Sequence, residues 1–229
     1  MMKYDDKEAL GTVERVENSG GTDKEAYFNG LAEKWDHISR HNMAKVERML
    51  ALLSIKPGDT VLDVGTGTGV LLSLLARLTD PTAVTAIDSA EKMIAVARRK
   101  TEGLGITFVA GDALSYPFQP ETFDHIVCYS VFPHFEDKRA VTRRLSGLLK
   151  RGGLLSVLHS DCRDKINRVH IHAGHQGIHG IRGDDLPPAR VVMNCMKDCA
   201  LREEILIDSE ELYMVCARKP WQPPQPPAV

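Results

Sequence analysis

Residues 61–78 constrain the fold of this chain more than any other stretch. Val61, Leu62 and Val64 form a short apolar run, which predicts a buried strand. Glycines follow at alternate positions, and leucines at helical spacing come next: Gly65, Gly67, Gly69, Leu71, Leu72, Leu74, Leu75 and Leu78. A strand, a glycine turn and a helix in this order form the first half of a βαβ unit. Because glycine has no Cβ, the backbone of such a turn can lie close to a ligand.

The spacing of the glycines separates two kinds of nucleotide site. A dinucleotide fingerprint, G-x-G-x-x-G, would need glycine at position 70, where this chain has Val70. The pattern from Asp63 to Gly69, D-x-G-x-G-x-G, resembles motif I of the class I S-adenosylmethionine (SAM) dependent methyltransferases. A dinucleotide-dependent oxidoreductase on a similar sheet is the first alternative.

The resemblance implies a role for each residue of this motif. The turn would hold the methionine moiety and the ribose of SAM, and Asp63 would lie near the ammonium group of the ligand. The cofactor-binding residues implied here are Asp63, Gly65, Thr66, Gly67, Thr68 and Gly69.

Two further turns with an acidic residue follow strand-like runs. Residues 83–88 read as a second strand that ends in Asp88, and a carboxylate at this place accepts hydrogen bonds from ribose hydroxyls. A third strand over residues 106–110 runs into a G-D-A turn, which in the family contacts the adenine. Core packing is the alternative role for Met93. The cofactor contacts implied in this region are Asp88, Ser89, Met93, Gly111, Asp112 and Ala113.

Residues 123–135 resemble motif IV of the same family, where the fourth strand ends and the acceptor site begins. Ligands of open α/β sheets gather at the carboxyl ends of the strands, so this segment is expected beside the donor methyl group. Ser130 is expected to contact the cofactor, and Phe132 the substrate. Tyr129 and His134 are candidate catalytic residues, because each could take part in proton removal from an acceptor.

The remaining segments complete one domain. A helix over residues 138–149 precedes a fifth strand, and residues 201–208 and 211–218 alternate like two further strands. The resemblance implies a Rossmann-like α/β fold with a seven-stranded, mostly parallel sheet in the order 3-2-1-4-5-7-6. The last strand would be antiparallel, and helices would cover both faces. With 229 residues, of which 43% are hydrophobic, the chain can build one substantial core.

Four parts are expected along the chain. Residues 1–21 read as a flexible N-terminal arm, and residues 22–55 as N-terminal lid helices. Residues 56–218 form the SAM-binding methyltransferase domain. The proline-rich residues 219–229 are expected to be disordered.

The lid sequence also carries a resemblance. FNGLAEKWD followed by IKPGDTVLDVGTGTG is similar to the ubiquinone/menaquinone biosynthesis methyltransferases. In such enzymes the lid closes over the cofactor, excludes water and shapes the substrate pocket. Tyr27, Phe28 and Trp35 are the lid residues expected to face the substrate.

Residues 159–186 are rich in histidine and are predicted to form a substrate loop. Three interpretations are open. His170 or His172 could act as a general base or orient the substrate, because imidazole titrates near neutral pH. The histidines could instead be polar loop residues without a chemical role. They could also bind a divalent transition metal, with His37, His41, His170, His172, His175 and His179 as candidate ligands.

Composition narrows the expected partners and location. The formal net charge is −2 and basic residues are spread along the chain, so neither nucleic acid nor a membrane surface is an expected partner. Five cysteines without a C-x-x-C motif fit a reducing compartment. The sequence shows no signal peptide and no apolar run of roughly 18 residues, so a cytoplasmic, soluble protein is expected.

The expected function is methyl transfer from SAM to a small-molecule acceptor at O, N or C, with a histidine or tyrosine assisting proton removal. His134 and His170 are the first choices for that role. The second alternative is a SAM- or metal-binding sensor on the same fold without turnover. Neither the acceptor nor the oligomeric state follows from the sequence.

Overall fold

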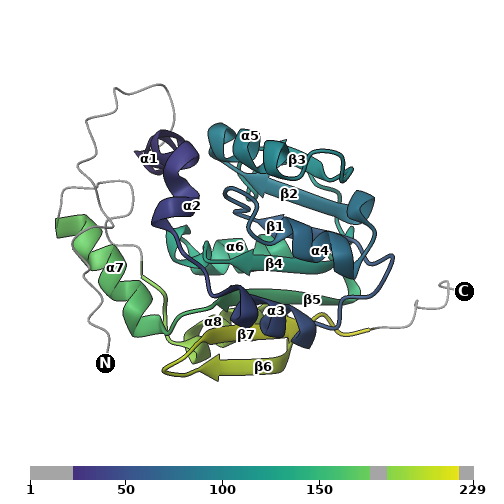
Figure 1. The fold of residues 1–229 in the computed structure, drawn as a ribbon. Helices are drawn as coiled ribbons and strands as arrows, with labels where there is room; N and C mark the ends of the chain where they lie inside the picture. Colours follow the sequence, from purple (N-terminus) through teal and green to yellow (C-terminus); the bar gives the residue numbers. More distant parts are fainter. Residues whose placement is uncertain (1–22, 176–184, 222–229) are drawn as a thin grey trace, which may run out of the picture.

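The structure is a computed structural model that describes residues 23–175 and 185–221 (Figure 1). The predicted arm over residues 1–21 lies outside the described residues, as does the predicted tail from residue 222 onward. Within the described ranges, no helix combines the length and apolar character needed to cross a membrane. The α-helices are α1 (Asp23–Leu31), α2 (Trp35–Ile38), α3 (Met43–Leu52), α4 (Leu72–Leu78), α5 (Glu91–Lys100), α6 (Lys138–Leu148), α7 (Arg163–His175) and α8 (Ala189–Asp198).

A seven-stranded sheet forms the middle layer, in the order β3-β2-β1-β4-β5-β7-β6. The pairs from β3 to β5 are parallel, whereas β7 runs antiparallel to both β5 and β6. The predicted fold class and strand order are therefore confirmed. The strands are β1 (Val61–Val64), β2 (Val84–Asp88), β3 (Thr107–Ala110), β4 (Phe123–Tyr129), β5 (Leu149–His159), β6 (Arg202–Asp208) and β7 (Tyr213–Arg218).

Helices cover both faces of the sheet, because side chains alternate along the central strands and supply two cores. In β1, Leu62 and Val64 belong to the core built with α6 and α8. Val61 belongs to the other core, built with α3 and α4. With both faces covered, a ligand reaches the sheet at the ends of its strands.

The described part of the lid, residues 23–55, is not one continuous helix. α1 ends at Leu31, a 3₁₀ turn (Ala32–Lys34) follows, and the short α2 begins at Trp35. Gly30 lies at the end of α1, and glycine there weakens a helix relative to alanine. The break allows the 3₁₀ turn to pack against α5.

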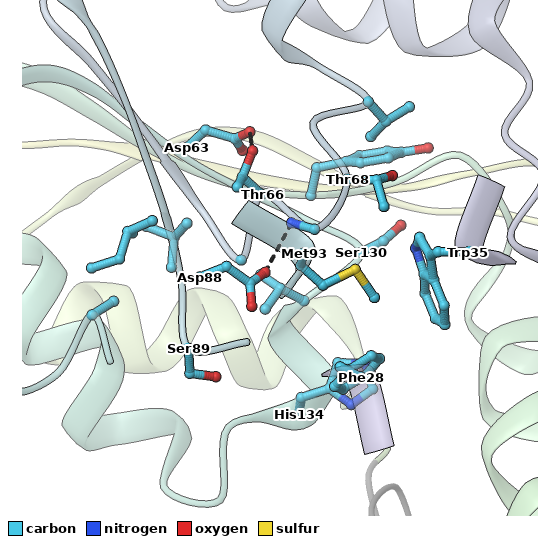
Figure 2. Close-up of a pocket in the computed structure, with 18 of the residues that line it drawn as sticks. Phe28, Trp35, Asp63, Thr66, Thr68, Asp88, Ser89, Met93, Ser130 and His134 are labelled. Carbon is cyan, nitrogen blue, oxygen red and sulfur yellow. Dashed lines mark hydrogen bonds between the residues drawn. The ribbon is translucent and has the colours of Figure 1, made fainter. Parts of the chain in front are cut away.

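Polar contacts fasten the lid to α5 and to the turn after β1. Asn29 Oδ1 accepts a hydrogen bond of 2.9 Å from Lys92 N. Asp36 accepts hydrogen bonds from Thr68 Oγ1 at 2.5 Å and from Lys100 Nζ at 2.7 Å. The lid is therefore held over the carboxyl ends of the strands, where Figure 2 shows its aromatic side chains facing the end of β2.

The prediction of a loop over residues 159–186 is wrong for part of that segment, because α7 is helical. Asp164 lies in the first turn of α7, where a carboxylate favours the helix dipole. The Asn167 side chain then joins α7 to the returning chain, since its amide donates to Leu186 O at 3.1 Å and accepts from Leu186 N at 2.8 Å. Residues 176–184 lie outside the described residues.

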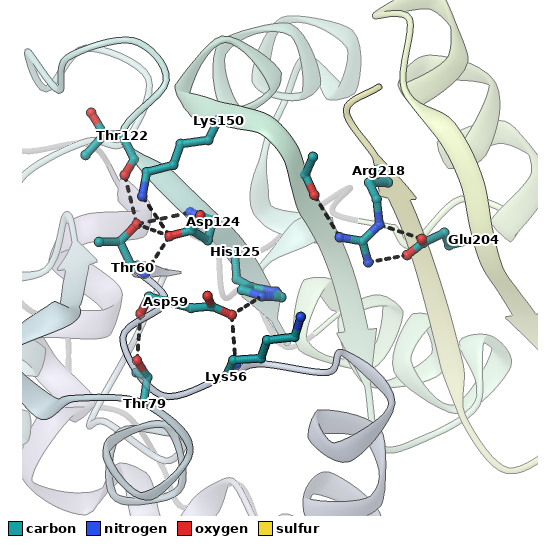
Figure 3. A network of polar contacts seen from close by, with 11 residues as sticks. Lys56, Asp59, Thr60, Thr79, Thr122, Asp124, His125, Lys150, Glu204 and Arg218 are labelled. Carbon is teal, nitrogen blue, oxygen red and sulfur yellow. Dashed lines mark hydrogen bonds and ion pairs between the residues drawn. The ribbon is translucent and has the colours of Figure 1, made fainter. Parts of the chain in front are cut away.

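A polar network joins the amino ends of β1, β4 and β5, at the opposite edge of the sheet from the glycine turn (Figure 3). Asp124 Oδ2 accepts hydrogen bonds from Thr60 N, Thr60 Oγ1 and Lys150 Nζ, each at 2.8 Å. Beside it, His125 Nε2 donates to Asp59 Oδ2 at 3.1 Å. This edge of the sheet is stabilised independently of any ligand.

Removal of the shared carboxylate should destabilise the fold. In Asp124→Ala, the Thr60 donors and the Lys150 ammonium lose their common acceptor, so the free energy of unfolding should fall by about 1–3 kcal/mol in urea denaturation. Asp198→Ala is the matched control, because it removes an exposed ion pair with Arg139 and should cost less than about 0.5 kcal/mol. Equal losses in the two variants would contradict a structural role for the network.

Candidate functional site

A cavity of about 320 Å³ opens where the turns after β1, β2, β3 and β4 meet the lid (Figure 2). The structure brings together all the residues predicted to bind the cofactor, with the exception of Gly69. Those that line the cavity are Asp63, Gly65, Thr66, Gly67, Thr68, Asp88, Ser89, Met93, Gly111, Asp112, Ala113 and Ser130.

Glycine is required at two positions of the turn for different reasons. Gly65 has a φ of +66°, and a Cβ there would lie 2.2 Å from Val131 Cγ2, so packing excludes any side chain. Gly67 has a φ of +54°, and a Cβ there would have Trp35 Nε1, itself in the cavity wall, as its nearest neighbour at 3.9 Å. The missing Cβ of Gly67 therefore leaves room for a ligand.

Gly69 does not line the cavity. An added Cβ would lie 2.9 Å from Leu72 Cδ1 and 3.1 Å from Ala97 Cβ, with a φ of +83°. The third glycine of the motif thus permits close packing between α4 and α5. Its predicted ligand contact does not occur in this geometry.

Asp63 is a buried acid, 2% exposed, in β1. Its Oδ2 accepts a hydrogen bond of 2.7 Å from Thr66 Oγ1. Burial raises the pKa of Asp63 to about 7, the Thr66 hydrogen bond opposes this, and the Asp88 charge adds to it. A cation in the cavity would favour the ionised carboxylate, which suits the ammonium group of SAM.

Asp88 ends β2 with its carboxylate fixed by backbone donors. Gly67 N donates to Oδ2 at 2.8 Å (Figure 2) and Ala90 N to Oδ1 at 2.9 Å. Burial raises the pKa of Asp88 above its ordinary value, although the two backbone hydrogen bonds oppose this rise. Each carboxylate oxygen can accept a further hydrogen bond, so vicinal ribose hydroxyls fit this group.

The side chain of Met93 lies between the core and the cavity. It is 1% exposed, belongs to the small cluster with Ala90 and Val96, and still lines the cavity. Core packing and ligand contact, which the sequence offered as alternatives, are therefore compatible at this position.

The turns after β3 and β4 form two further walls. Asp112 is exposed, and its Oδ1 accepts a hydrogen bond of 3.0 Å from Leu114 N. Ser130 follows β4 with a φ of +55°, a conformation that residues other than glycine rarely adopt. Ser130 N donates to Leu158 O at 3.0 Å, which holds the strained residue at the strand end.

Aromatic side chains of the lid form a further wall of the cavity. Phe28 and Trp35 line the cavity with ring centroids 5.4 Å apart, and Phe28 lies 5.2 Å from His134. Tyr27 contacts Phe28 at 5.3 Å but does not line the cavity. The predicted substrate contact of Phe132 is wrong: this side chain is 1% exposed and packs in the core below α6.

The candidate catalytic histidines occupy different places. His134 lines the cavity, whereas His170 of α7 does not, although their ring centroids are 5.2 Å apart. The side chains of His172 and His175 lie outside the description, and so does all of His179. Of the predicted catalytic residues, Tyr129 and His134 therefore border the cavity directly.

The structure adds His41, which the sequence suggested only as a metal ligand. Its Nδ1 lies 2.9 Å from the Tyr129 hydroxyl and its Nε2 lies 3.1 Å from Ser39 Oγ. Because both ring nitrogens are engaged, His41 is not available to a metal, and His37 is exposed. In the part of the chain that the structure describes, no cluster of three or more His, Cys, Asp or Glu side chains could hold a metal ion.

Comparisons with known proteins agree with this geometry. Residues 61–153 match the family model of a methyltransferase domain. The demethylmenaquinone methyltransferase of Thermotoga maritima is 34% identical over 146 residues, which cover 61% of this chain and 63% of that protein. This chain spans 57% of the length of the Staphylococcus aureus demethylmenaquinone methyltransferase, at 27% identity. The chain thus matches less than two thirds of the length of these curated relatives.

Solved structures share the fold. A SAM-dependent methyltransferase from Methanococcus maripaludis, described as putative, superposes with a TM-score of 0.65 at 20% identity, covering 93% of this chain and all of that one. Phosphoethanolamine N-methyltransferase 2 of Haemonchus contortus, solved with SAM, gives a TM-score of 0.65 at 17% identity, covering 84% of this chain and 57% of that one.

Gly67→Val should abolish binding of S-adenosylhomocysteine (SAH), because the new side chain would fill the space that the missing Cβ leaves. Calorimetry should show an affinity lower by at least about 100-fold. Gly58→Val is the matched control, since Gly58 has a φ of +88° with no atom near its Cβ position. In both variants the new valine must adopt a left-handed backbone conformation, which costs about 1–2 kcal/mol. Normal SAH affinity in folded Gly67→Val would refute the placement of the turn.

Asp63→Asn should weaken ligand binding and stabilise the ligand-free protein. Because the folded-state pKa of Asp63 is raised from 3.8 to about 7, ionisation destabilises the ligand-free fold progressively between about pH 4 and pH 7 and fully above that. The asparagine variant should therefore be more stable than the parent at pH 8, by a margin on the order of 4 kcal/mol, and by less at pH 5. Its SAH affinity at pH 8 should fall about tenfold or more.

Thermal and urea denaturation of both proteins at the two pH values measures this difference. A stability difference that is independent of pH would show that Asp63 ionises normally in the folded protein.

Proposed function

We propose that this chain, which carries a class I SAM-dependent methyltransferase domain similar to the quinone biosynthesis group, transfers a methyl group from SAM to a small-molecule acceptor. The single observation that supports this most is the cavity at the strand ends. One side of it presents the glycine turn with Asp63 and Asp88, and the other presents aromatic and proton-accepting side chains. A donor and an acceptor can therefore lie side by side in it.

The donor side fits SAM by the chemistry of its residues. The Asp88 carboxylate suits ribose hydroxyls, the Asp63 carboxyl suits the ammonium group, and Met93 offers an apolar surface to the adenine. The backbone at Gly67 lets the ligand approach without steric conflict. When bound, SAM supplies an electrophilic methyl group on a positively charged sulfur.

The acceptor side orients and shields the second substrate. Phe28, Trp35 and Phe135 provide apolar contact area, and the lid over them excludes water. His134 and Tyr129 can hold or move a proton of the acceptor. Holding donor and acceptor in line is the larger part of catalysis in such a site, because it removes the entropic cost of their encounter.

The acceptor and its location form the finer part of the proposal. Demethylmenaquinone, which gives the curated relatives their name, is the first acceptor to try. Nucleic acid is a poor fit to a chain with net charge −2. The five cysteines are free thiols, which fits a reducing cytoplasm.

Transfer of an isotope-labelled methyl group from SAM tests the proposal. The purified chain is incubated with a small-molecule extract of the source cells, and separately with demethylmenaquinone, and products are resolved by mass spectrometry. A product that carries the label is expected. A chain that binds SAH but labels no product would contradict turnover and favour the sensor.

His170→Ala should spare cofactor binding and lower turnover. His170 does not line the cavity but contacts the His134 ring, so its loss should reduce the rate of labelled transfer about tenfold through misplacement of His134. SAH affinity should stay within about twofold of the parent. Unchanged turnover would assign His170 a purely structural role.

A further inference from the structure

A chain of hydrogen bonds crosses the acceptor side of the cavity from the lid to the sheet. Ser39 Oγ lies 3.1 Å from His41 Nε2, and His41 Nδ1 lies 2.9 Å from the Tyr129 hydroxyl. That hydroxyl lies 2.9 Å from Ser160 Oγ. Ser39, His41 and Tyr129 all line the cavity, whereas Ser160 is 6% exposed and does not. A molecule in the cavity therefore meets Tyr129 and His41 together.

The surroundings of His41 favour its neutral form. Burial lowers the pKa of His41. The negative charges of Asp161 and Asp36 oppose this shift, whereas the positive charge of Lys100 adds to it. His159 of β5 also acts on it, but burial lowers the pKa of His159 to about 3, so this neighbour is uncharged near neutral pH. An imidazole that is neutral at pH 7 can accept a proton.

The hydrogen-bond partners admit a tautomer of His41 in which Tyr129 donates to Nδ1. Burial raises the pKa of Tyr129, so its phenol keeps its proton at neutral pH. With Nε2–H of His41 donating to Ser39 Oγ, Nδ1 is left to accept the Tyr129 O–H. Ser160 Oγ can donate to the Tyr129 oxygen, and the Ser130 side chain hydrogen-bonds to it as well, so a donor in the cavity would take the place of Ser130.

His41 owes its place to tertiary packing. It directly precedes Asn42, the N-cap residue of α3, whose side chain accepts a hydrogen bond from Lys45 N. The buried face of α3, with Val46 and Met49, packs on the sheet. Tyr129 comes from the end of β4, 88 positions later in the chain. The pair therefore exists only when the lid is folded against the sheet.

We propose that Tyr129 takes the proton of the methyl acceptor and passes its own proton to His41, so that sheet and lid together form the base. This inference rests on the proposed function. It assigns the acceptor to compounds that present an ionisable O–H or N–H to the Tyr129 oxygen.

The step balances in atoms and electrons. The acceptor atom bonds to the methyl carbon, and the electron pair of the broken carbon–sulfur bond stays on sulfur. The proton of the acceptor moves to the Tyr129 oxygen as the phenol proton moves to His41 Nδ1. Tyr129 ends neutral and His41 ends as an imidazolium, which releases its proton to solvent. In this scheme Tyr129 contacts the acceptor, and His41 acts through Tyr129.

His41→Gln separates hydrogen bonding from proton uptake. The glutamine amide can still bond Ser39 and Tyr129, but it cannot take a proton. The rate of labelled methyl transfer into the small-molecule extract is measured from about pH 5.5 to about pH 9. For the parent, the rate should rise with pH and level off with a midpoint below the ordinary histidine value of about 6.5.

His41→Gln should lose the rise of the rate with pH and be at least about 100-fold slower than the parent at pH 7. Its SAH affinity should stay within about threefold of the parent's. His37→Gln, at an exposed position of the same lid, is the matched control and should change neither property. Parental rates and an unchanged pH profile in His41→Gln would overturn the inference. A parent that transfers no methyl group would overturn it together with the proposed function, before any variant is made.

A second readout needs no turnover. In protein labelled with ¹⁵N-histidine, the His41 signals, assigned by their loss in His41→Gln, should show the Nε2–H tautomer and a titration midpoint below about 6.5. Tyr129→Phe should shift them, because Nδ1 loses its donor. An Nδ1–H tautomer, or signals that Tyr129→Phe leaves in place, would show that the pair does not form.

Discussion

The hydrogen bond from Gly67 N to Asp88 Oδ2 is the contact on which the site depends. It joins the turn after β1 to the end of the neighbouring parallel strand β2. Gly65 N and Thr66 N reinforce it by donating to Ile87 O at 2.8 and 3.1 Å. With the turn fixed in this way, Thr68 reaches Asp36 of the lid. The donor wall and the lid are therefore positioned by one short segment of backbone.

This arrangement concentrates electrostatic cost where a ligand would bind. Asp63 and Asp88 are both buried, and burial raises both of their pKa values. At the amino ends of the strands the acids are paired instead, as Asp124 is with Lys150. A ligand with a cationic group and hydroxyls would relieve the cost at the carboxyl ends. Asp63 and Asp88 thus differ from Asp124, because neither has a lysine or arginine partner among the ion pairs of the described residues.

The sequence predicted what depends on local spacing. A strand, a glycine turn and a helix form a known unit. The strand order and most residues of the donor side could therefore be predicted from positions such as Asp63 and Asp88. Gly69 was misjudged because the motif does not say which glycine faces the ligand and which faces a helix. Phe132 failed for a similar reason, since the 3₁₀ turn that it begins directs its ring into the core.

What the sequence could not supply depends on packing between distant segments. The place of His41 follows from the docking of α3, and its partner Tyr129 lies at the end of β4. The sequence predicted a loop over residues 159–186, where the structure has α7 over Arg163–His175. Residues that work as pairs across the lid are therefore found only once the fold is known.

Calorimetric titration of the chain with SAH and, separately, with NADH tests the central claim most directly. The glycine turn with Val70 after Gly69, together with the cavity beside Asp63 and Asp88, predicts that SAH binds at one site per chain and that NADH does not bind. Binding of NADH without binding of SAH would contradict the account and favour the alternative of a dinucleotide-dependent oxidoreductase.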